Sequence, residues 1–245
     1  MKKDVLLLSG AGQIGLAIAR RMGFGMKIVI GDKSLTHAEA VAETMNRAGF
    51  DAVARAMDLA SRESILALIA EARHYGEIAM LVNAAGVSPS QASVATILEV
   101  DLYGTAVLLE EVGRVIAPGG TGVTIFSQSG HRMPALSPEE DEALATTPTG
   151  ELLALDLLQP QHIRDTLHAY QLAKRCNVKR VMAEAVKWGT RGARINSISP
   201  GIIVTPLALD EFEGPRGDFY REMFARCPAG RPGVRPSRWP TWPSC

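Results

Sequence analysis

Residues 10–15, with the sequence GAGQIG, could bind the pyrophosphate of a dinucleotide. Glycines in such a turn let the backbone bend tightly and approach the phosphates. A helix that begins there also offers free N–H groups and the positive end of its dipole. The alternative is a tight turn without a ligand, because glycine-rich turns are common. The turn follows an apolar run at residues 4–9, so it occupies the place between a strand and a helix that dinucleotide binding requires.

Asp32 stands at the end of the next apolar run, where it could select the dinucleotide. A carboxylate at this place can accept hydrogen bonds from a ribose 2′-hydroxyl and would repel a 2′-phosphate. Adjacent Lys33 could partly offset that repulsion, and the other interpretation of Asp32 is a solvated helix cap. The sequence therefore predicts NAD rather than NADP as the cofactor.

Tyr170 and Lys174 are four residues apart, a spacing that places a phenol and an ammonium group on one face of a helix. The alternative interpretation is a surface helix with two unrelated side chains. The spacing is informative because the chain contains only 4 tyrosines. It does not decide between the two interpretations by itself.

The composition argues against several classes of protein. The chain has 245 residues, of which 47% are hydrophobic, and its 26 basic side chains balance 26 acidic ones. Without surplus positive charge, nucleic-acid binding is not expected. No apolar run is long enough to span a membrane, and 3 cysteines without C-x-x-C spacing argue against a disulfide framework or a metal site. We expect a soluble, cytoplasmic protein with neither nucleic-acid nor membrane partners.

Short apolar runs alternate with longer segments of helical period, which is typical of a parallel sheet with crossover helices. The predicted strands are residues 4–9, 27–31, 52–57, 78–83, 122–126 and 193–199. The predicted helices are residues 14–22, 35–48, 61–75, 95–115 and 165–188. A capping box that begins at Ser137 predicts a further short helix. The fold class is α/β: a single doubly wound parallel sheet of the Rossmann type, with helices on both faces.

The order of the motifs along the chain resembles that of the short-chain dehydrogenase/reductase family. The matching features are the glycine turn, Asp32, Asp58-Leu59, Asn83-Ala84-Ala85-Gly86, Ser127 at a strand end, Tyr170 with Lys174, and residues 200–206 (PGIIVTP). The resemblance covers residues 4–233 and implies one NAD(P)-binding catalytic domain at residues 1–233. It implies the interconversion of a secondary alcohol and a ketone by hydride transfer, with a small-molecule substrate, in a protein that is usually a homo-oligomer.

The resemblance also implies a role for individual side chains. Tyr170 would be the general acid/base, and the positive charge of Lys174 would stabilise its anion, since a free phenol is a poor base at neutral pH. Lys174 would also hold the nicotinamide ribose. Ser127 would hydrogen-bond the substrate oxygen, and we prefer it to Gln128 and Ser129 because a glycine follows three residues later.

Other residues would contact the cofactor, together with Tyr170 and Lys174. By the resemblance they are Gly10, Gly12, Gln13, Ile14, Gly15, Asp32, Asp58, Leu59, Asn83, Ala84, Ala85, Gly86, Pro200, Gly201, Ile203 and Thr205. Thr205 has an alternative interpretation as the N-cap of a helix.

Asp101 departs from the family pattern, which usually has Asn there to complete a water-mediated proton relay to the lysine. By position it is a candidate catalytic residue. An aspartate keeps an acceptor but loses the amide donors, and its charge would lie near Lys174, so we expect slower proton transfer than with Asn.

Two alternative functions stay open. One is a non-catalytic dinucleotide-binding protein, and the other is a sugar-nucleotide epimerase, which the shorter form of the glycine turn would suit.

Three segments need separate interpretation. Residues 131–161 form an insertion before the Tyr170 helix, and we expect it to shape the substrate pocket and alter subunit contacts. Residues 207–226, which include Phe212, Phe219, Tyr220 and Phe224, are expected to be a mobile lid. Residues 234–245 are rich in Pro, Arg and Trp, so we expect a disordered tail. A shifted reading frame would explain this composition and would leave the final strand of the family missing.

Overall fold

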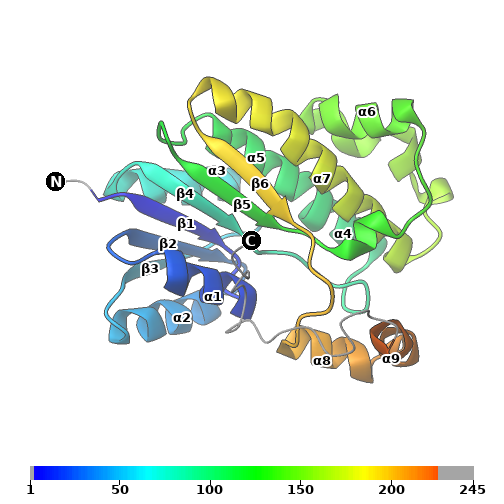
Figure 1. Cartoon of the computed structure of the whole chain (residues 1–245), viewed down its shortest axis with the longest axis horizontal. Coiled ribbons are helices and arrows are strands. Elements are labelled where there is room, and N and C mark those ends of the chain that lie inside the picture. Colours follow the sequence, from blue (N-terminus) through cyan, green and yellow to red (C-terminus); the bar gives the residue numbers. More distant parts are fainter. Residues whose placement is uncertain (1–2, 226–245) are drawn as a thin grey trace, which may run out of the picture.

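Six parallel strands form the central sheet of the computed structural model, which describes residues 3–225 (Figure 1). The strands are β1 (Val5–Ser9), β2 (Lys27–Asp32), β3 (Asp51–Ala56), β4 (Ile78–Asn83), β5 (Thr121–Ile125) and β6 (Arg194–Ile198). Their order, β3-β2-β1-β4-β5-β6, is that of a doubly wound dinucleotide-binding sheet. The predicted fold class is thus confirmed, and each predicted strand is present. The predicted tail and any further strand fall outside the described residues.

Helices pack on both faces of the sheet (Figure 1). Side chains of a strand point alternately to its two faces, and those of β1 divide accordingly. Leu6 and Leu8 join one core cluster, beneath the first two helices, while Val5 and Leu7 join the other. The helices of the first face are α1 (Gln13–Met22) and α2 (Leu35–Arg47), and those of the second are α3 (Arg62–Tyr75), α5 (Thr105–Gly113) and α7 (Thr166–Thr190).

The helix predicted at residues 95–115 is interrupted by a π-helical segment. It consists of α4 (Val94–Ile97), the π segment η1 (Leu98–Gly104) and then α5. A π segment widens the helix by one residue and often occurs at functional sites. Here it contains Asp101, whose side chain is fully buried. Periodicity alone does not reveal such an interruption.

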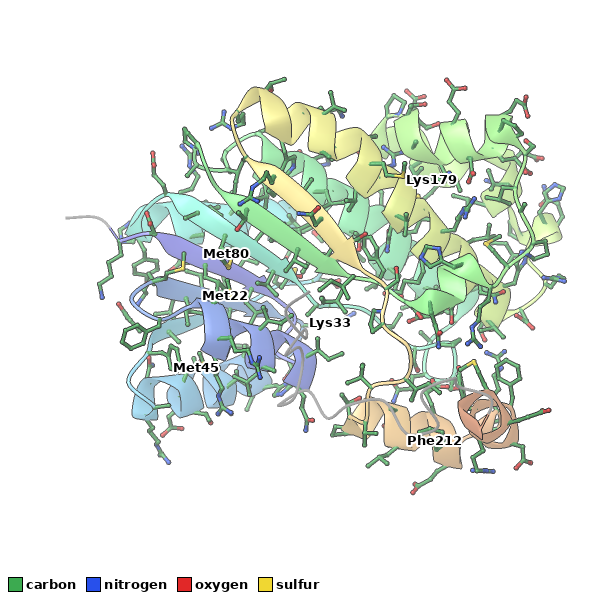
Figure 2. All side chains as sticks on the ribbon, in the orientation of Figure 1. Met22, Lys33, Met45, Met80, Lys179 and Phe212 are labelled. Atoms are coloured by element: carbon green, nitrogen blue, oxygen red, sulfur yellow. The ribbon has the colours of Figure 1, made fainter. Side chains whose placement is uncertain are left out.

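The insertion packs on α7. It contains one α-helix, α6 (Pro138–Thr146). Four short 3₁₀ segments also lie in or beside it: η2 (Gln128–His131), η3 (Thr149–Ala154), η4 (Asp156–Leu158) and η5 (Pro160–His162). The predicted capping box of α6 is present. Leu144, Leu152 and Leu158 of the insertion join a third core cluster with residues of η1 and α7. Figure 2 labels Lys179 where α7 faces α6.

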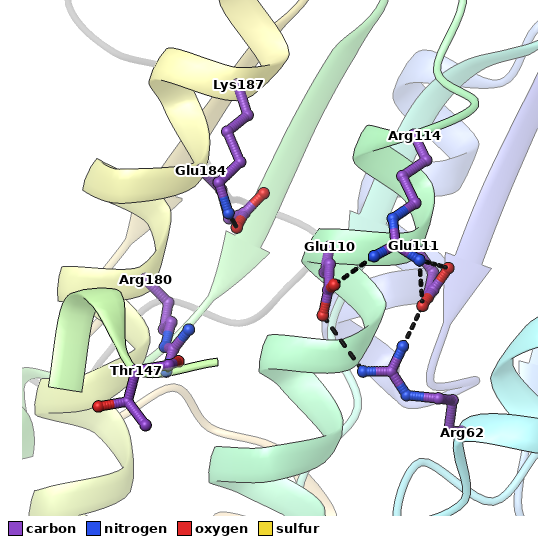
Figure 3. A network of polar contacts seen from close by, with 8 residues as sticks. All are labelled: Arg62, Glu110, Glu111, Arg114, Thr147, Arg180, Glu184 and Lys187. Atoms are coloured by element: carbon purple, nitrogen blue, oxygen red, sulfur yellow. Dashed lines mark hydrogen bonds and ion pairs between the residues drawn. The ribbon is translucent and has the colours of Figure 1, made fainter. Parts of the chain in front are cut away.

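A charged network fixes α3 to α5 on the second face of the sheet (Figure 3). Arg62 of α3 pairs with both Glu110 and Glu111 of α5, and its nitrogen lies 3.2 Å from Glu110. Arg114 contacts the same two carboxylates and lies 3.0 Å from Glu111. The network therefore joins two helices of the layer that also contains α7.

None of the helices described is long and apolar enough to cross a membrane.

Candidate active site

A cavity of about 630 Å³ lies at the carboxyl ends of β1 and β4, where the strand order reverses. Ligands of doubly wound sheets bind at this switch point. Most of the residues predicted to contact the cofactor line this cavity: Gly10, Gly12, Gln13, Ile14, Gly15, Asp32, Asp58, Leu59, Ala84, Ala85, Gly86 and Thr205. The fold therefore brings together residues that are far apart in the sequence.

The glycine turn has a geometry that other residues would not allow. Gly10 has a φ of +92°, and a Cβ atom there would lie 2.5 Å from the backbone nitrogen of Ala85. A Cβ at Gly15 would lie 2.5 Å from the carbonyl oxygen of Gly10. The N-cap of α1, Gly12, places no side chain over the first N–H groups of the helix. These residues fit a pyrophosphate, which such N–H groups bind.

Asp32 is held in place at the end of β2. One carboxylate oxygen accepts from the N–H of Ala11 at 2.9 Å, and the other accepts from the N–H of Ser34 at 3.0 Å. Each oxygen keeps acceptor capacity for a ribose hydroxyl. Neighbouring Lys33 lies 3.4 Å from Asp58 at the same cavity, and the lysine side chain is exposed whereas that of Asp58 is partly buried.

A second, smaller cavity of about 170 Å³ adjoins the first, since Ile14 and Thr205 line both. Ser127 and Tyr170 both line it, and the Ser127 side chain is close enough to lower the pKa of the Tyr170 phenol. The Ser127 hydroxyl also accepts from the N–H of Ser129 at 3.1 Å, which orients it. The alternatives Gln128 and Ser129 line the same cavity, as do three predicted cofactor residues: Pro200, Gly201 and Ile203.

Lys174 and Asp101 form a buried ion pair behind Tyr170. The ammonium nitrogen lies 3.0 Å from a carboxylate oxygen and 5.0 Å from the centre of the Tyr170 ring. Burial opposes the charge of Lys174, but Asp101 and Tyr170 outweigh it and raise the pKa of the lysine. Burial raises the pKa of Asp101, although Lys174 and the N–H of Val87 act in the opposite direction. The predicted proximity of Asp101 to Lys174 is thus present.

The environment of Tyr170 favours the protonated phenol. Burial raises its pKa, and the carboxylates Asp101 and Glu211 raise it further, whereas Lys174 and the nearby Ser127 side chain lower it. The net direction is upward. A phenol that holds its proton can act as a general acid, and its conversion to a base depends on nearby positive charge.

Two further residues predicted to contact the cofactor, Asn83 and Thr205, differ in whether they reach the cavities. Asn83 is 1% exposed at the end of β4 and lines neither cavity. The Thr205 hydroxyl accepts from the N–H of Ala208 at 3.2 Å, so the residue caps α8 (Pro206–Glu213) and also faces both cavities. The interpretation of Thr205 as an N-cap is confirmed, and its contact with the cofactor stays a prediction.

The expected lid consists of α8 and α9 (Gly217–Ala225). Phe212, labelled in Figure 2 on α8, and Tyr220 line the smaller cavity, whereas Phe219 is 50% exposed. The side chain of Phe224 is not among those that the structure describes. No described residue of 131–161 lines this cavity, so the structure does not support the expectation that the insertion shapes the pocket. The insertion packs on α7 through the third core cluster, against which Tyr170 also packs.

Sequence reasoning missed Ser88 and Glu211, which also line the smaller cavity. No local pattern in the sequence marks either residue, because α8 meets the loop around Ser90 only through tertiary packing. Among the described residues, no three His, Cys, Asp or Glu side chains lie close enough together to hold a metal ion.

The chain is similar to known proteins over nearly its whole length. Residues 3–137 match the family model described as short chain dehydrogenase, and residues 136–238 match one described as enoyl-(acyl carrier protein) reductase. The short-chain dehydrogenase/reductase bsc3 of Alternaria brassicicola is 35% identical, over 95% of this chain and 85% of that protein. The D-threitol dehydrogenase of Mycolicibacterium smegmatis is 32% identical, over 94% of this chain and 80% of that protein.

Solved structures share the fold. A variant of actinorhodin polyketide ketoreductase with NADPH has a TM-score of 0.72 and 24% identity, over 96% of this chain and 86% of that one. The structure of gox2181 has a TM-score of 0.73 and 22% identity, over 97% of this chain and 85% of that one.

Proposed function

We propose that Tyr170, Ser127 and Lys174 carry out the proton chemistry of this enzyme. The premise is that the chain belongs to the short-chain dehydrogenase/reductase family. It is therefore an NAD(P)-dependent oxidoreductase that interconverts alcohols and ketones. The observation that supports this proposal most is that Ser127 and Tyr170 line one cavity beside the dinucleotide cleft, with the ammonium nitrogen of Lys174 5.0 Å from the centre of the Tyr170 ring. When bound, the nicotinamide would supply or accept the hydride.

In the reductive direction, Tyr170 donates its proton to the substrate oxygen. Ser127 donates a hydrogen bond to the same oxygen and fixes its position. Asp101 and Tyr170 raise the pKa of Lys174 in spite of its burial, and the charge of Lys174 stabilises the phenolate that remains. In oxidation the same phenolate takes the proton from the alcohol. Asp101 is a positioning residue in this proposal, since it holds both the ammonium group of Lys174 and the N–H of Val87.

The preferred cofactor in this proposal is NAD. Asp32 would accept hydrogen bonds from the adenosine ribose and repel a 2′-phosphate. Lys33 lies 3.4 Å from Asp58, which competes with any 2′-phosphate for its charge. Asp58 and Leu59 would then lie beside the adenine.

A Tyr170→Phe variant tests the catalytic proposal. The phenyl ring keeps the packing but cannot exchange a proton, so kcat for ketone reduction should fall by about 10²- to 10⁴-fold. NADH binding, followed by fluorescence, should change little. Unchanged turnover in the variant would remove Tyr170 from the mechanism. Binding of NADH without turnover in the wild-type protein would favour the non-catalytic alternative.

An Asp32→Ser variant tests the cofactor preference. Without the carboxylate, the ratio of kcat/KM for NADP to that for NAD should rise at least about tenfold, which corresponds to about 1.4 kcal/mol. Lys33→Ala, at the adjacent position, is the matched control and should leave the preference for NAD in place. A wild-type enzyme that prefers NADP would contradict the assignment of Asp32.

The quaternary structure is also a proposal. The insertion covers one side of α7 through Leu144 of α6, where a helix-to-helix subunit contact is usual in the family. We therefore propose that any homo-oligomer uses another surface. Sedimentation of the full chain measures its subunit number.

A further inference from the structure

Glu211 is a buried carboxylate at the substrate cavity, with no part in the proton chemistry. It is 9% exposed and lines the same cavity as Ser127 and Tyr170. Its charge contributes to the raised pKa of Tyr170, so the two groups share one electrostatic environment. A carboxylate in such a place is costly unless its acceptor capacity is used.

The known partners of Glu211 are neutral donors. The hydroxyl of Ser90 donates at 2.7 Å and its N–H at 3.4 Å, and Tyr220, whose pKa Glu211 raises, lines the same cavity. Among the described residues, no cation forms an ion pair with Glu211. Two carboxylate oxygens can accept about four hydrogen bonds, so capacity remains toward the cavity.

Ser88 offers a second, independent polar group in the same cavity. It is 4% exposed, and its hydroxyl has no hydrogen-bond partner within the part of the chain that the structure describes. An unpaired buried hydroxyl lowers stability by about 1–3 kcal/mol unless a ligand or water satisfies it. Unlike a carboxylate, it can both donate and accept.

We propose that Glu211 and Ser88 bind a second hydroxyl group of the substrate, so that the enzyme acts on small polyols and hydroxyketones. This inference rests on the proposed function of Tyr170. A hydroxyl can donate to Glu211 and accept from Ser88 at once, whereas an ammonium group has no acceptor for Ser88. A substrate carboxylate would be repelled by Glu211. The cavity volume of about 170 Å³ also suits a small molecule, since pockets for drug-sized ligands are about 300–1,000 Å³.

Matched pairs of alcohols test the inference in the full chain. With NAD, the values of kcat/KM are compared for 2,3-butanediol against 2-butanol, and for trans-cyclohexane-1,2-diol against cyclohexanol. The wild-type enzyme should prefer the diol of each pair by about 10- to 100-fold, since a site built for a hydroxyl discriminates against its absence. In Glu211→Gln that ratio should fall by about tenfold, because the amide loses one charged acceptor.

Two further variants separate recognition from packing. Asp210→Ala removes the neighbouring exposed carboxylate, which accepts from Gln91 at 3.1 Å and ties α8 to the same loop. It does not line the cavity, so the diol ratio should persist. Ser88→Ala leaves a methyl group in place of the hydroxyl and should lower the ratio by a few fold. Thermal unfolding of each variant checks that it is folded.

The outcomes are distinct. Equal kcat/KM for diol and mono-alcohol in the wild type would overturn the inference while leaving the proposed function in place. So would equal losses of the ratio in Glu211→Gln and Asp210→Ala, which would make Glu211 a loop anchor. Preference for 1-amino-2-propanol or lactate over the diol would also overturn it, in favour of a cationic or an anionic substrate. If no alcohol is oxidised although the cofactor binds, the proposed function fails and the inference fails with it.

Discussion

Two carboxylates pair with cations on consecutive residues of α7, and their surroundings differ. Asp101 of η1 lies 3.0 Å from Lys174, and the two side chains are 0% and 6% exposed. Asp141 of α6 lies 2.8 Å from Arg175, and these side chains are 18% and 24% exposed. Similar distances therefore join α7 to two different segments, one beneath the active site and one on the insertion.

Burial decides what each pair does. Burial raises the pKa of Asp101 in spite of the lysine, whereas hydrogen bonds from Arg175 and Lys179 lower the pKa of Asp141. A fully buried pair has a desolvation cost that its attraction does not reliably offset. The desolvation cost of the Asp141 carboxylate is smaller, because it and its two cations are partly exposed. We infer that the Asp101 pair holds Lys174 for function, and that the Asp141 pair stabilises the insertion.

The largest effect is expected when the buried pair is broken. Lys174→Met leaves the carboxylate of Asp101 buried without its cation, which should lower the free energy of unfolding by about 3–5 kcal/mol. Urea unfolding measures this change. Turnover should also be lost, since the phenolate of Tyr170 loses its nearest positive charge.

A double variant is the control. Asp101→Asn with Lys174→Met removes both charges, and the asparagine oxygen can still accept from the N–H of Val87. Most of the lost stability should return, but turnover should not. A double variant no more stable than Lys174→Met would mean that the cost lies in packing and not in an unpaired charge.

A smaller effect is expected on the pH dependence of the reaction. Asp101 raises the pKa of Tyr170, so Asp101→Asn should lower it, because the phenolate no longer faces a second negative charge. The rising limb of the pH–rate profile for alcohol oxidation should therefore move to lower pH, and the rate at neutral pH should increase by up to about tenfold.

Asp141→Asn is the matched control for that shift. It removes the same charge from the neighbouring pair on α7, away from the cavities. Its pH–rate profile should stay that of the wild type. A profile of Asp101→Asn that moves to higher pH, or does not move, would contradict the role given to Asp101.

The fold and the cofactor-binding part of the site could be predicted from the sequence more fully than the substrate cavity could. Most strands are short, largely apolar runs. The glycine turn follows one of them and Asp32 ends another, so their place at the carboxyl ends of the strands could be predicted. The π segment could not, because it depends on one extra residue within a helical turn that periodicity does not mark. Glu211 and Ser88 come together only through the packing of α8 against a loop more than a hundred residues away in the sequence, which no local pattern reports.

The smallest effect is expected at the insertion. Asp141→Asn removes a charge that receives hydrogen bonds from Arg175 at 2.8 Å and 3.1 Å, with Lys179 at 2.7 Å. Charged hydrogen bonds of this exposure should contribute about 1–2 kcal/mol to the free energy of unfolding at neutral pH. Because the pKa of Asp141 is lower in the folded state, this contribution is present above its ordinary value of 3.8 and is lost as the pH falls through the folded value. Urea unfolding at several pH values should therefore show the wild type and the variant converging in acid. Glu142→Gln, one residue along and exposed, should change stability by less than about 0.5 kcal/mol. A difference between wild type and Asp141→Asn that persists at low pH would show that the insertion is held by its apolar contacts and not by this pair.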